Sequence, residues 1–245
     1  MPDFECLIQP DMVVNITSPT IGILDSINVD KSDYVKKGEV LALLESGVQK
    51  ASAEVARAQA ERLDQIRLRE TDLAFAKRKL VRITELHEKH SISPLEMDEA
   101  ETAVSRAELE LQKAQNENQL ARLEYDKAMQ ILERRTIRSP IDGIIVNKSA
   151  FPGELTEDKP IFTIAKVDPL RVELIVPVEY FGFIKPGMKT RITPEIESTS
   201  KHIATVTVVD KVIDAPSGTF SVRLSLPNPK QELPGGLKCQ AKFLP

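Results

Sequence analysis

A short repeat with a long helical pattern between its two copies is the feature that most constrains this chain. Ser18-Pro19-Thr20-Ile21-Gly22 returns as Ser139-Pro140-Ile141-Asp142-Gly143, and each copy opens a β-like segment that runs on to a second glycine, Gly38 or Gly153. Between the copies, residues 48–93 contain neither glycine nor proline. Because these two residues punctuate turns, their absence predicts long helices. We therefore expect one β module split by a helical hairpin, which is more typical of an assembly component than of an enzyme pocket.

Heptad spacing supports two helical arms. Ile66, Leu73 and Leu80 lie seven residues apart in the first arm. The second arm repeats alanine at one heptad position and a larger residue at the other: Ala100, Ala107, Ala114, Ala121 and Ala128, with Val104, Leu111, Asn118, Tyr125 and Leu132. This pattern predicts antiparallel helices that approach closely, and a buried Asn118 can fix their register. At 1.5 Å rise per residue, arms of about 40 residues give a hairpin roughly 60 Å long.

A helix-start signal separates the arms. Ser93 is placed as an N-cap, with Pro94 at the first helical position and Glu96 at the third. This is the capping-box arrangement, and proline is tolerated at that position because its missing N–H would be unpaired anyway. The hairpin tip is therefore expected near residues 88–93.

Strand patterns occupy both flanks of the hairpin. Short apolar runs divided by turn residues cover about 4–46, and strand-like patterns return at Ile137. From about Val167, alternating apolar and polar residues separated by turns such as Lys185-Pro186-Gly187 predict a second, small β-barrel. The chain is thus expected to be an elongated α+β protein.

Composition and motifs exclude several classes. The net charge of −4 gives no reason to expect nucleic acid, no apolar run approaches 18 residues, and the N-terminus lacks a signal-peptide pattern. No phosphate-binding glycine loop or nucleophile pattern is present, so we expect no enzyme and no cofactor. His87 and His90 lack an obvious closed ligand set, so no metal site is expected. Cys6 and Cys239 either pair or remain two separate thiols.

At this point the ordered motifs resemble a known family, the membrane fusion proteins or periplasmic adaptors of the HlyD type. The resemblance runs through nearly the whole chain. It is carried by Ser18-Pro19 to Leu41, by Ile137 to Leu155 and, in the barrel, by Asp168-Pro169-Leu170, Ile184-Lys185-Pro186-Gly187 and Leu233-Pro234-Gly235. The resemblance implies a lipoyl-like β-sandwich made from two halves. On this basis the expected parts are an N-terminal strand that joins the barrel (1–12), the lipoyl-like halves (13–47 and 136–166), the hairpin (48–135) and the barrel (167–245).

The resemblance also implies partners and a location. Such adaptors form a hexamer, a trimer of dimers, in the periplasm of a Gram-negative cell, anchored to the inner membrane through a segment outside this chain. They bridge an inner-membrane transporter, here expected to be of the RND class with an ABC transporter as the alternative, and a TolC-like outer-membrane channel. The family usually continues past Pro234-Gly235-Gly236 into a membrane-proximal domain. We therefore expect either a piece of a longer protein or a short natural variant.

Two sites follow from the resemblance. Channel-binding adaptors resemble one another in an Arg-x3-Leu-x6-Ser pattern across the hairpin tip, and Arg82, Leu86 and Ser93 match its spacing. Simpler roles are a surface charge for Arg82, packing for Leu86 and helix capping for Ser93. In some members a glutamine in the loop of the second β half forms a gating ring. Here that loop carries Phe151, which predicts either an apolar inner constriction or packing on its own module.

Two other functions stay open. One is a cytosolic coiled-coil scaffold with β end domains. The other is a lipoyl or biotinyl carrier, whose modified lysine sits in an exposed hairpin turn. That turn is replaced here by the helices, and Lys50 lacks the usual flanking residues.

Overall fold

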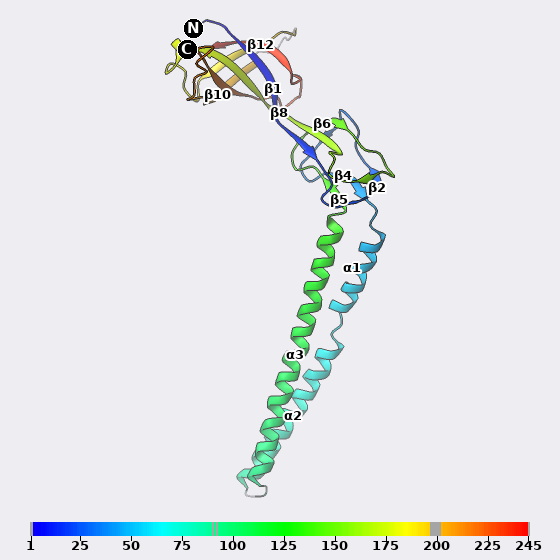
Figure 1. Cartoon of the computed structure of the whole chain (residues 1–245). Helices are drawn as coiled ribbons and strands as arrows, with labels where there is room; N and C mark the ends of the chain where they lie inside the picture. The colour runs from blue at the N-terminus through cyan, green and yellow to red at the C-terminus, as the bar shows by residue number, and fades with distance from the viewer. Residues whose placement is uncertain (1, 90, 92, 197–201, 245) are drawn as a thin grey trace. The chain divides into compact units, whose positions relative to one another are not determined.

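The structure is a computed structural model that describes residues 2–89, 91, 93–196 and 202–244 (Figure 1). Its contacts divide the chain into two compact units: Ser46–Arg135, and Met1–Glu45 together with Thr136–Pro245. The first unit is helical and the second is built from strands. The predicted α+β class, with a split β-sandwich, an inserted helical hairpin and a barrel, is confirmed.

The barrel consists of six antiparallel strands. They are β1 (Phe4–Ile16), β8 (Phe162–Pro177), β9 (Lys189–Pro194), β10 (His202–Val209), β11 (Thr219–Leu226) and β12 (Leu237–Phe243). The order is β1-β12-β9-β10-β11-β8, and pairing of β1 with β8 closes the ring. Alternate side chains point inward, so Val222 and Leu224 of β11 are buried with Ile8 and Val172. Closure leaves no unpaired edge among the six described barrel strands.

Two barrel strands continue into the sandwich without a break. The β1–β8 pairing runs from Cys6 opposite Leu174 to Ile16 opposite Phe162, with one register shift between Pro10 and Met12. Neither strand ends at the boundaries expected from the sequence, after residues 12 and 166. The two β modules therefore share one hydrogen-bonded ribbon.

The sandwich is completed by short strands from both sides of the hairpin. They are β2 (Gly22–Ile27), β3 (Tyr34–Val35), β4 (Val40–Leu44), β5 (Thr136–Arg138), β6 (Gly143–Lys148) and β7 (Leu155–Thr156). One sheet has the order β5-β4-β2-β7, while β6 and β3 extend the β8 edge of the other. A separate apolar core, which includes Leu24, Leu41 and Phe162, lies in this module.

The two copies of the repeat adopt the same local structure. The Ser18 hydroxyl donates to the carbonyl of Thr20 at 2.5 Å, and the Ser139 hydroxyl donates to that of Ile141 at 2.6 Å. In the second copy the glycine is required by close approach. A Cβ on Gly143 would lie 2.4 Å from the carbonyl oxygen of Ala165 on β8.

Cys6 and Cys239 form a disulfide and are not two separate thiols. Cys6 of β1 and Cys239 of β12 face each other in the ladder, with their Cα atoms 4.8 Å apart, and their sulfurs are bonded. The bond links the first and last strands of the barrel. The sequence could not decide this pairing because the partners are 233 residues apart.

The hairpin unit consists of α1 (Gly47–Ala60), α2 (Asp64–Glu88) and α3 (Pro94–Glu133). The predicted capping box at the start of α3 is confirmed. The Ser93 hydroxyl accepts from the Glu96 backbone N–H, and the Glu96 carboxylate accepts from the Ser93 N–H at 3.0 Å.

The expectation of one continuous helix in the first arm is wrong, because residues 61–63 interrupt it. Ala53 and Ala60 are buried seven residues apart, but only six residues separate Ala60 from Ile66, where the seam resumes. A one-residue deficit would rotate an unbroken helix by about 100° away from the seam. The chain leaves the helix instead, while α3 keeps its heptads throughout.

Asn118 stabilises this interruption. Its side-chain amide donates to the backbone carbonyls of Ala60 at 2.9 Å and Arg62 at 3.2 Å. A helix end leaves such carbonyls without partners, and the amide supplies the missing donors. Asn118 thus does lie in the seam, and it caps the break in the opposite arm.

Candidate functional site

The sequence-predicted tip residues lie around the end of α2 and the start of α3. Arg82 and Leu86 are one helical turn apart on α2, and both are exposed, Leu86 by 43%. The backbone N–H of Ser91 donates to the Leu86 carbonyl at 3.0 Å, which ties the turn to that residue. The tip therefore presents a guanidinium and an apolar side chain from one helix.

Ser93 already has partners. Its hydroxyl accepts from the Glu96 N–H and donates to the Glu96 carboxylate, each at 3.3 Å. The helix-capping role expected for Ser93 is thus observed. A contact between the Ser93 hydroxyl and a partner protein would compete with its two hydrogen bonds to Glu96. His90 and Ile92, also in the predicted tip, lie outside the described residues.

Phe151 lies in a tethered loop between β6 and β7. Phe151 is 58% exposed. The Lys148 ammonium lies 5.9 Å from the ring centre and 2.9 Å from a carboxylate oxygen of Asp30. The hydrogen bond from Lys148, followed by one from the Lys31 N–H, lowers the pKa of Asp30. Glu154 accepts from the Phe151 N–H at 3.2 Å, so the loop is held while the ring projects.

The described residues contain no group of three or more His, Cys, Asp and Glu side chains that could hold a metal ion. His87 is half-buried, and its Nδ1 has no partner among them. His90, which was considered with His87 as a possible pair of metal ligands, lies outside the described residues. Lys50, the carrier-lysine candidate, lies within α1. None of the described helices is long and apolar enough to cross a membrane.

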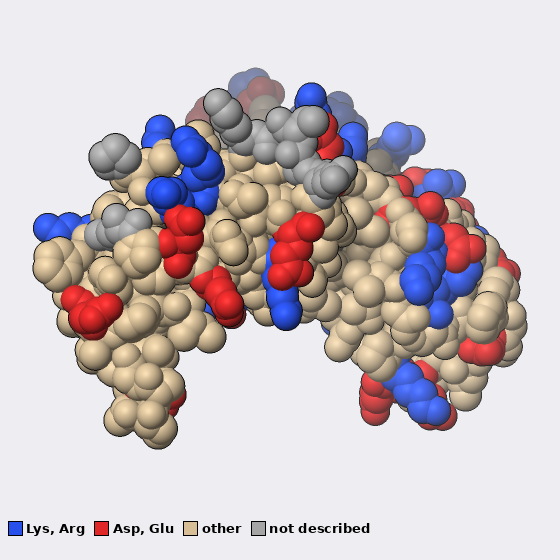
Figure 2. Space-filling view, turned by 90° about the horizontal axis from the view of Figure 1, so that it is seen from above, with Lys and Arg blue, Asp and Glu red and all other residues tan. Residues whose placement is uncertain are grey.

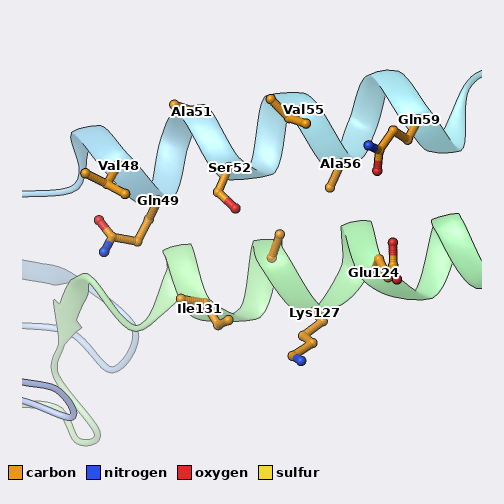
Figure 3. A pocket seen from close by; sticks show the side chains of 11 residues that line it. Val48, Gln49, Ala51, Ser52, Val55, Ala56, Gln59, Glu124, Lys127 and Ile131 are labelled. Carbon is orange, nitrogen blue, oxygen red and sulfur yellow. The ribbon is translucent and has the colours of Figure 1, made fainter.

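Two grooves along the hairpin were missed in the sequence analysis. The base groove, about 820 Å³, lies between α1 and α3 (Figure 3); its apolar lining includes Val48, Val55 and Ile131. The tip groove, about 730 Å³, lies between α2 and α3; most of its lining residues are charged, among them Arg69, Asp98 and Glu110, and the rest include Ala76 and Leu95.

Both grooves open on the same side of α3. The α3 residues Arg106, Ala107 and Glu110 of the tip groove recur three heptads later as Lys127, Ala128 and Ile131 of the base groove. Residues three heptads apart occupy one face of a seam-forming helix. We call this face of the hairpin the groove side.

The charged side chains on the face shown in Figure 2 do not gather into a site. On the face shown in Figure 2, basic and acidic side chains are interspersed and form no broad field of one sign. The charges along the hairpin pair locally, as where the Lys77 ammonium lies 2.9 Å from the carboxylate of Glu108 across the arms.

Comparison with known proteins identifies the family. The sequence profile of the CzcB-like, barrel-sandwich hybrid domain matches residues 12–166, which include both sandwich halves and the hairpin. The chain belongs to this family. The predicted resemblance to membrane fusion proteins is thereby confirmed.

Relatives cover nearly all of this chain but are longer. The chain is 26% identical over 235 residues to the cobalt-zinc-cadmium resistance protein CzcB of Cupriavidus metallidurans, covering 95% of this chain and 42% of that protein. It is 24% identical over 221 residues to an uncharacterised protein of Haemophilus influenzae, covering 89% and 50%. The chain thus spans half or less of the length of these relatives.

Solved structures share the fold. MacA from Actinobacillus actinomycetemcomitans matches with a TM-score of 0.78 and 20% identity, covering 99% of this chain and 78% of that one. ZneB from Cupriavidus metallidurans matches with a TM-score of 0.52 and 22% identity, covering 99% and 97%. At these identities the likeness concerns the fold alone.

Proposed function

We propose that this chain is the adaptor part of a tripartite efflux system and has no catalytic activity of its own. In this function it links an inner-membrane transporter to a TolC-like outer-membrane channel in the periplasm of a Gram-negative cell. It assembles as a hexamer and is anchored by a segment outside this sequence. An RND transporter is the first partner to test and an ABC transporter the second.

The observation that carries the proposal is the hairpin tip. An exposed arginine and an exposed leucine, one turn apart, suit a contact with another helical protein. The guanidinium of Arg82 can donate to carboxylates or backbone carbonyls, and Leu86 supplies apolar area. Ser93 then contributes chiefly by fixing the start of α3 through its cap. The proposed channel-contact site is thus Arg82, Leu86 and Ser93, in which Arg82 and Leu86 touch the channel and Ser93 positions the turn.

Phe151 is proposed to line an inner constriction of the assembled ring. Its exposure and the tether through Lys148 and Glu154 support a ring that projects from its module. An apolar constriction would slow the passage of hydrated substrates. Because CzcB is named for cobalt, zinc and cadmium resistance, we propose divalent metal cations as the first substrate class to test.

The test is complementation in a strain that lacks the adaptor gene, with the full-length gene product and growth on graded zinc, cobalt and cadmium salts. Arg82→Asp should reduce tolerance to the level of the empty vector, because it places a carboxylate where a cation is required. Arg78→Asp is the matched control: it makes the same change one turn earlier on the same helix and should retain tolerance. Wild-type tolerance of Arg82→Asp would remove the tip assignment.

Ser93 needs a pair of variants because it is a cap. Ser93→Asn preserves capping, since asparagine is an equally good N-cap, whereas Ser93→Arg removes the cap and adds bulk. If the hydroxyl itself contacts the channel, both variants lose tolerance. If the cap is what matters, Ser93→Asn retains it. Drug tolerance is measured in the same complemented strains. Its comparison with metal tolerance tests whether metal cations are the substrate class.

A further inference from the structure

The loop that carries Phe151 lies beside a pair of opposite charges. The Lys148 ammonium, at the end of β6, is 2.9 Å from a carboxylate oxygen of Asp30 and 5.9 Å from the centre of the Phe151 ring. The Lys148 side chain is only 20% exposed, whereas that of Asp30 is 70% exposed. Because much of the lysine is removed from water, its charge needs a close partner. Among the described residues, Asp30 supplies the carboxylate within ion-pair distance.

The turn that carries Asp30 is anchored to β6 by its backbone. The Ser32 N–H donates to the Ile145 carbonyl at 2.8 Å, and the Ile145 N–H donates to the Asp33 carbonyl at 2.9 Å. The Asp33 carboxylate also accepts from the Asp30 N–H at 2.7 Å. An asparagine at position 30 would keep these contacts and remove only the charge, so the role of that charge can be tested by itself.

The charges nearest the Phe151 ring leave a small negative excess. Glu154, whose carboxylate accepts from the Phe151 N–H at 3.2 Å, is the second acidic group beside the ring. The ammonium of Lys148 against the carboxylates of Asp30 and Glu154 leaves a net charge of −1 for each copy of the chain. Salt screens exposed charges beyond about 8–10 Å, so this cluster acts only on an ion close to the ring. A negative surround there favours a cation over an anion.

Loss of the Asp30 carboxylate would bring an ammonium onto the ring. An aromatic face attracts an ammonium that lies within about 6 Å of its centre, and Lys148 already lies at that limit. Without the competing carboxylate, the lysine would move over the face of Phe151. In the ring of copies proposed above, each copy would then place an ammonium at the constriction, and these charges would repel a passing cation.

We propose that Asp30 determines the charge selectivity of the Phe151 constriction. By binding the Lys148 ammonium, Asp30 holds that charge off the ring face, so that the constriction passes divalent cations in preference to anions. Asp30 acts through Lys148 and is therefore a positioning residue that needs no contact with the substrate. This inference rests on the proposed function, because it takes Phe151 to line the constriction and metal cations to be the substrate class.

The experiment measures the initial rate of zinc efflux from preloaded cells of the strain that lacks the adaptor gene, complemented with full-length variants. Asp30→Asn removes the negative excess and should slow efflux by about fivefold or more, the effect of one unit charge about 8 Å from a divalent cation in water. Lys148→Gln makes the cluster more negative and should speed efflux. The double variant has the wild-type net charge, so its rate should lie within about twofold of the wild-type rate.

Three controls separate the charge at the constriction from other effects of the substitutions. Asp210→Asn makes the same change in an exposed barrel loop and should leave the efflux rate unchanged. In a Phe151→Ala background the constriction is wider, so Asp30→Asn should change the rate by less than about twofold. Urea unfolding of the purified 245-residue chain checks that each variant folds.

An ion pair that only holds the loop in place predicts a different pattern. Lys148→Gln would then slow efflux as much as Asp30→Asn does, and the double variant would not recover. That pattern, a wild-type rate for Asp30→Asn, or the full effect of Asp30→Asn in the Phe151→Ala background would each overturn this inference and leave the proposed function in place. A wild-type gene that restores no zinc efflux would overturn the proposed substrate class and this inference with it.

Discussion

The disulfide between Cys6 and Cys239 gives the most quantitative prediction. It joins the first and last barrel strands across a loop of 233 residues. In the chain-entropy treatment, closing a loop of n residues removes about 2.1 + 1.5R ln n cal/mol/K from the unfolded ensemble, which gives about 5.5 kcal/mol here at 25 °C. Reduction should therefore cost the β unit most of its stability, since small domains are stable by only about 5–15 kcal/mol.

The hairpin refines this value. Its 90 residues, 46–135, form a unit of their own and contain neither cysteine. If they stay folded while the β unit unfolds, the effective loop falls to about 143 residues and the predicted cost to about 5 kcal/mol. Reduction of the disulfide is therefore predicted to lower the free energy of unfolding of the β unit by about 5 kcal/mol and to leave that of the hairpin unchanged.

Hydrogen exchange measured by mass spectrometry is the appropriate assay, because it reports each segment separately. Peptides from β1, β8 and β12 should lose protection when the bond is reduced or when both cysteines are replaced by alanine, while peptides from α2 and α3 should not. The reduced wild-type chain controls for the side-chain change. Unchanged protection in β1 and β12, or equal loss in α3, would refute the reasoning.

Three further predictions concern single contacts. Gly143→Ala should destabilise the β unit by about 1–3 kcal/mol in urea unfolding, because its Cβ meets the Ala165 carbonyl; an unchanged free energy of unfolding would contradict the close approach. Asn118→Ala should cost the hairpin about 1–2 kcal/mol in the same assay, because two carbonyls at the break lose their donor. One alanine inserted between Glu61 and Arg62 restores the seven-residue spacing between Ala60 and Ile66 and should slow hydrogen exchange at residues 61–63. Equally fast exchange would show that the missing residue is not what interrupts the helix.

Much of the fold was predictable because its signals are local. The second arm keeps its heptads from Ala100 to Leu132, and the capping box at Ser93 and Glu96 lies within four residues. Arg82 and Leu86 were singled out through the resemblance to the Arg-x3-Leu-x6-Ser pattern; helix spacing predicts only that they lie one turn apart on one face.

Other features depended on contacts between distant residues. The first arm looked continuous because Glu61, Arg62 and Leu63 are ordinary helix formers. Its break appears only when Ala60 and Ile66 must both face α3, with Asn118 available to cap the gap. The groove side was missed because an exposed leucine is identified only after the seam has been assigned.

The sequence by itself determined the order of parts, a β module divided by a hairpin and followed by a barrel, because repeats, heptads and turn residues act over a few neighbours. Only the tertiary structure decided that β1 and β8 run unbroken through both β modules, that Cys6 meets Cys239, and that two grooves lie along one side of the hairpin. Strand register, barrel closure and helix-side exposure are set by packing between segments that are far apart in the chain, and one-dimensional patterns do not record that packing.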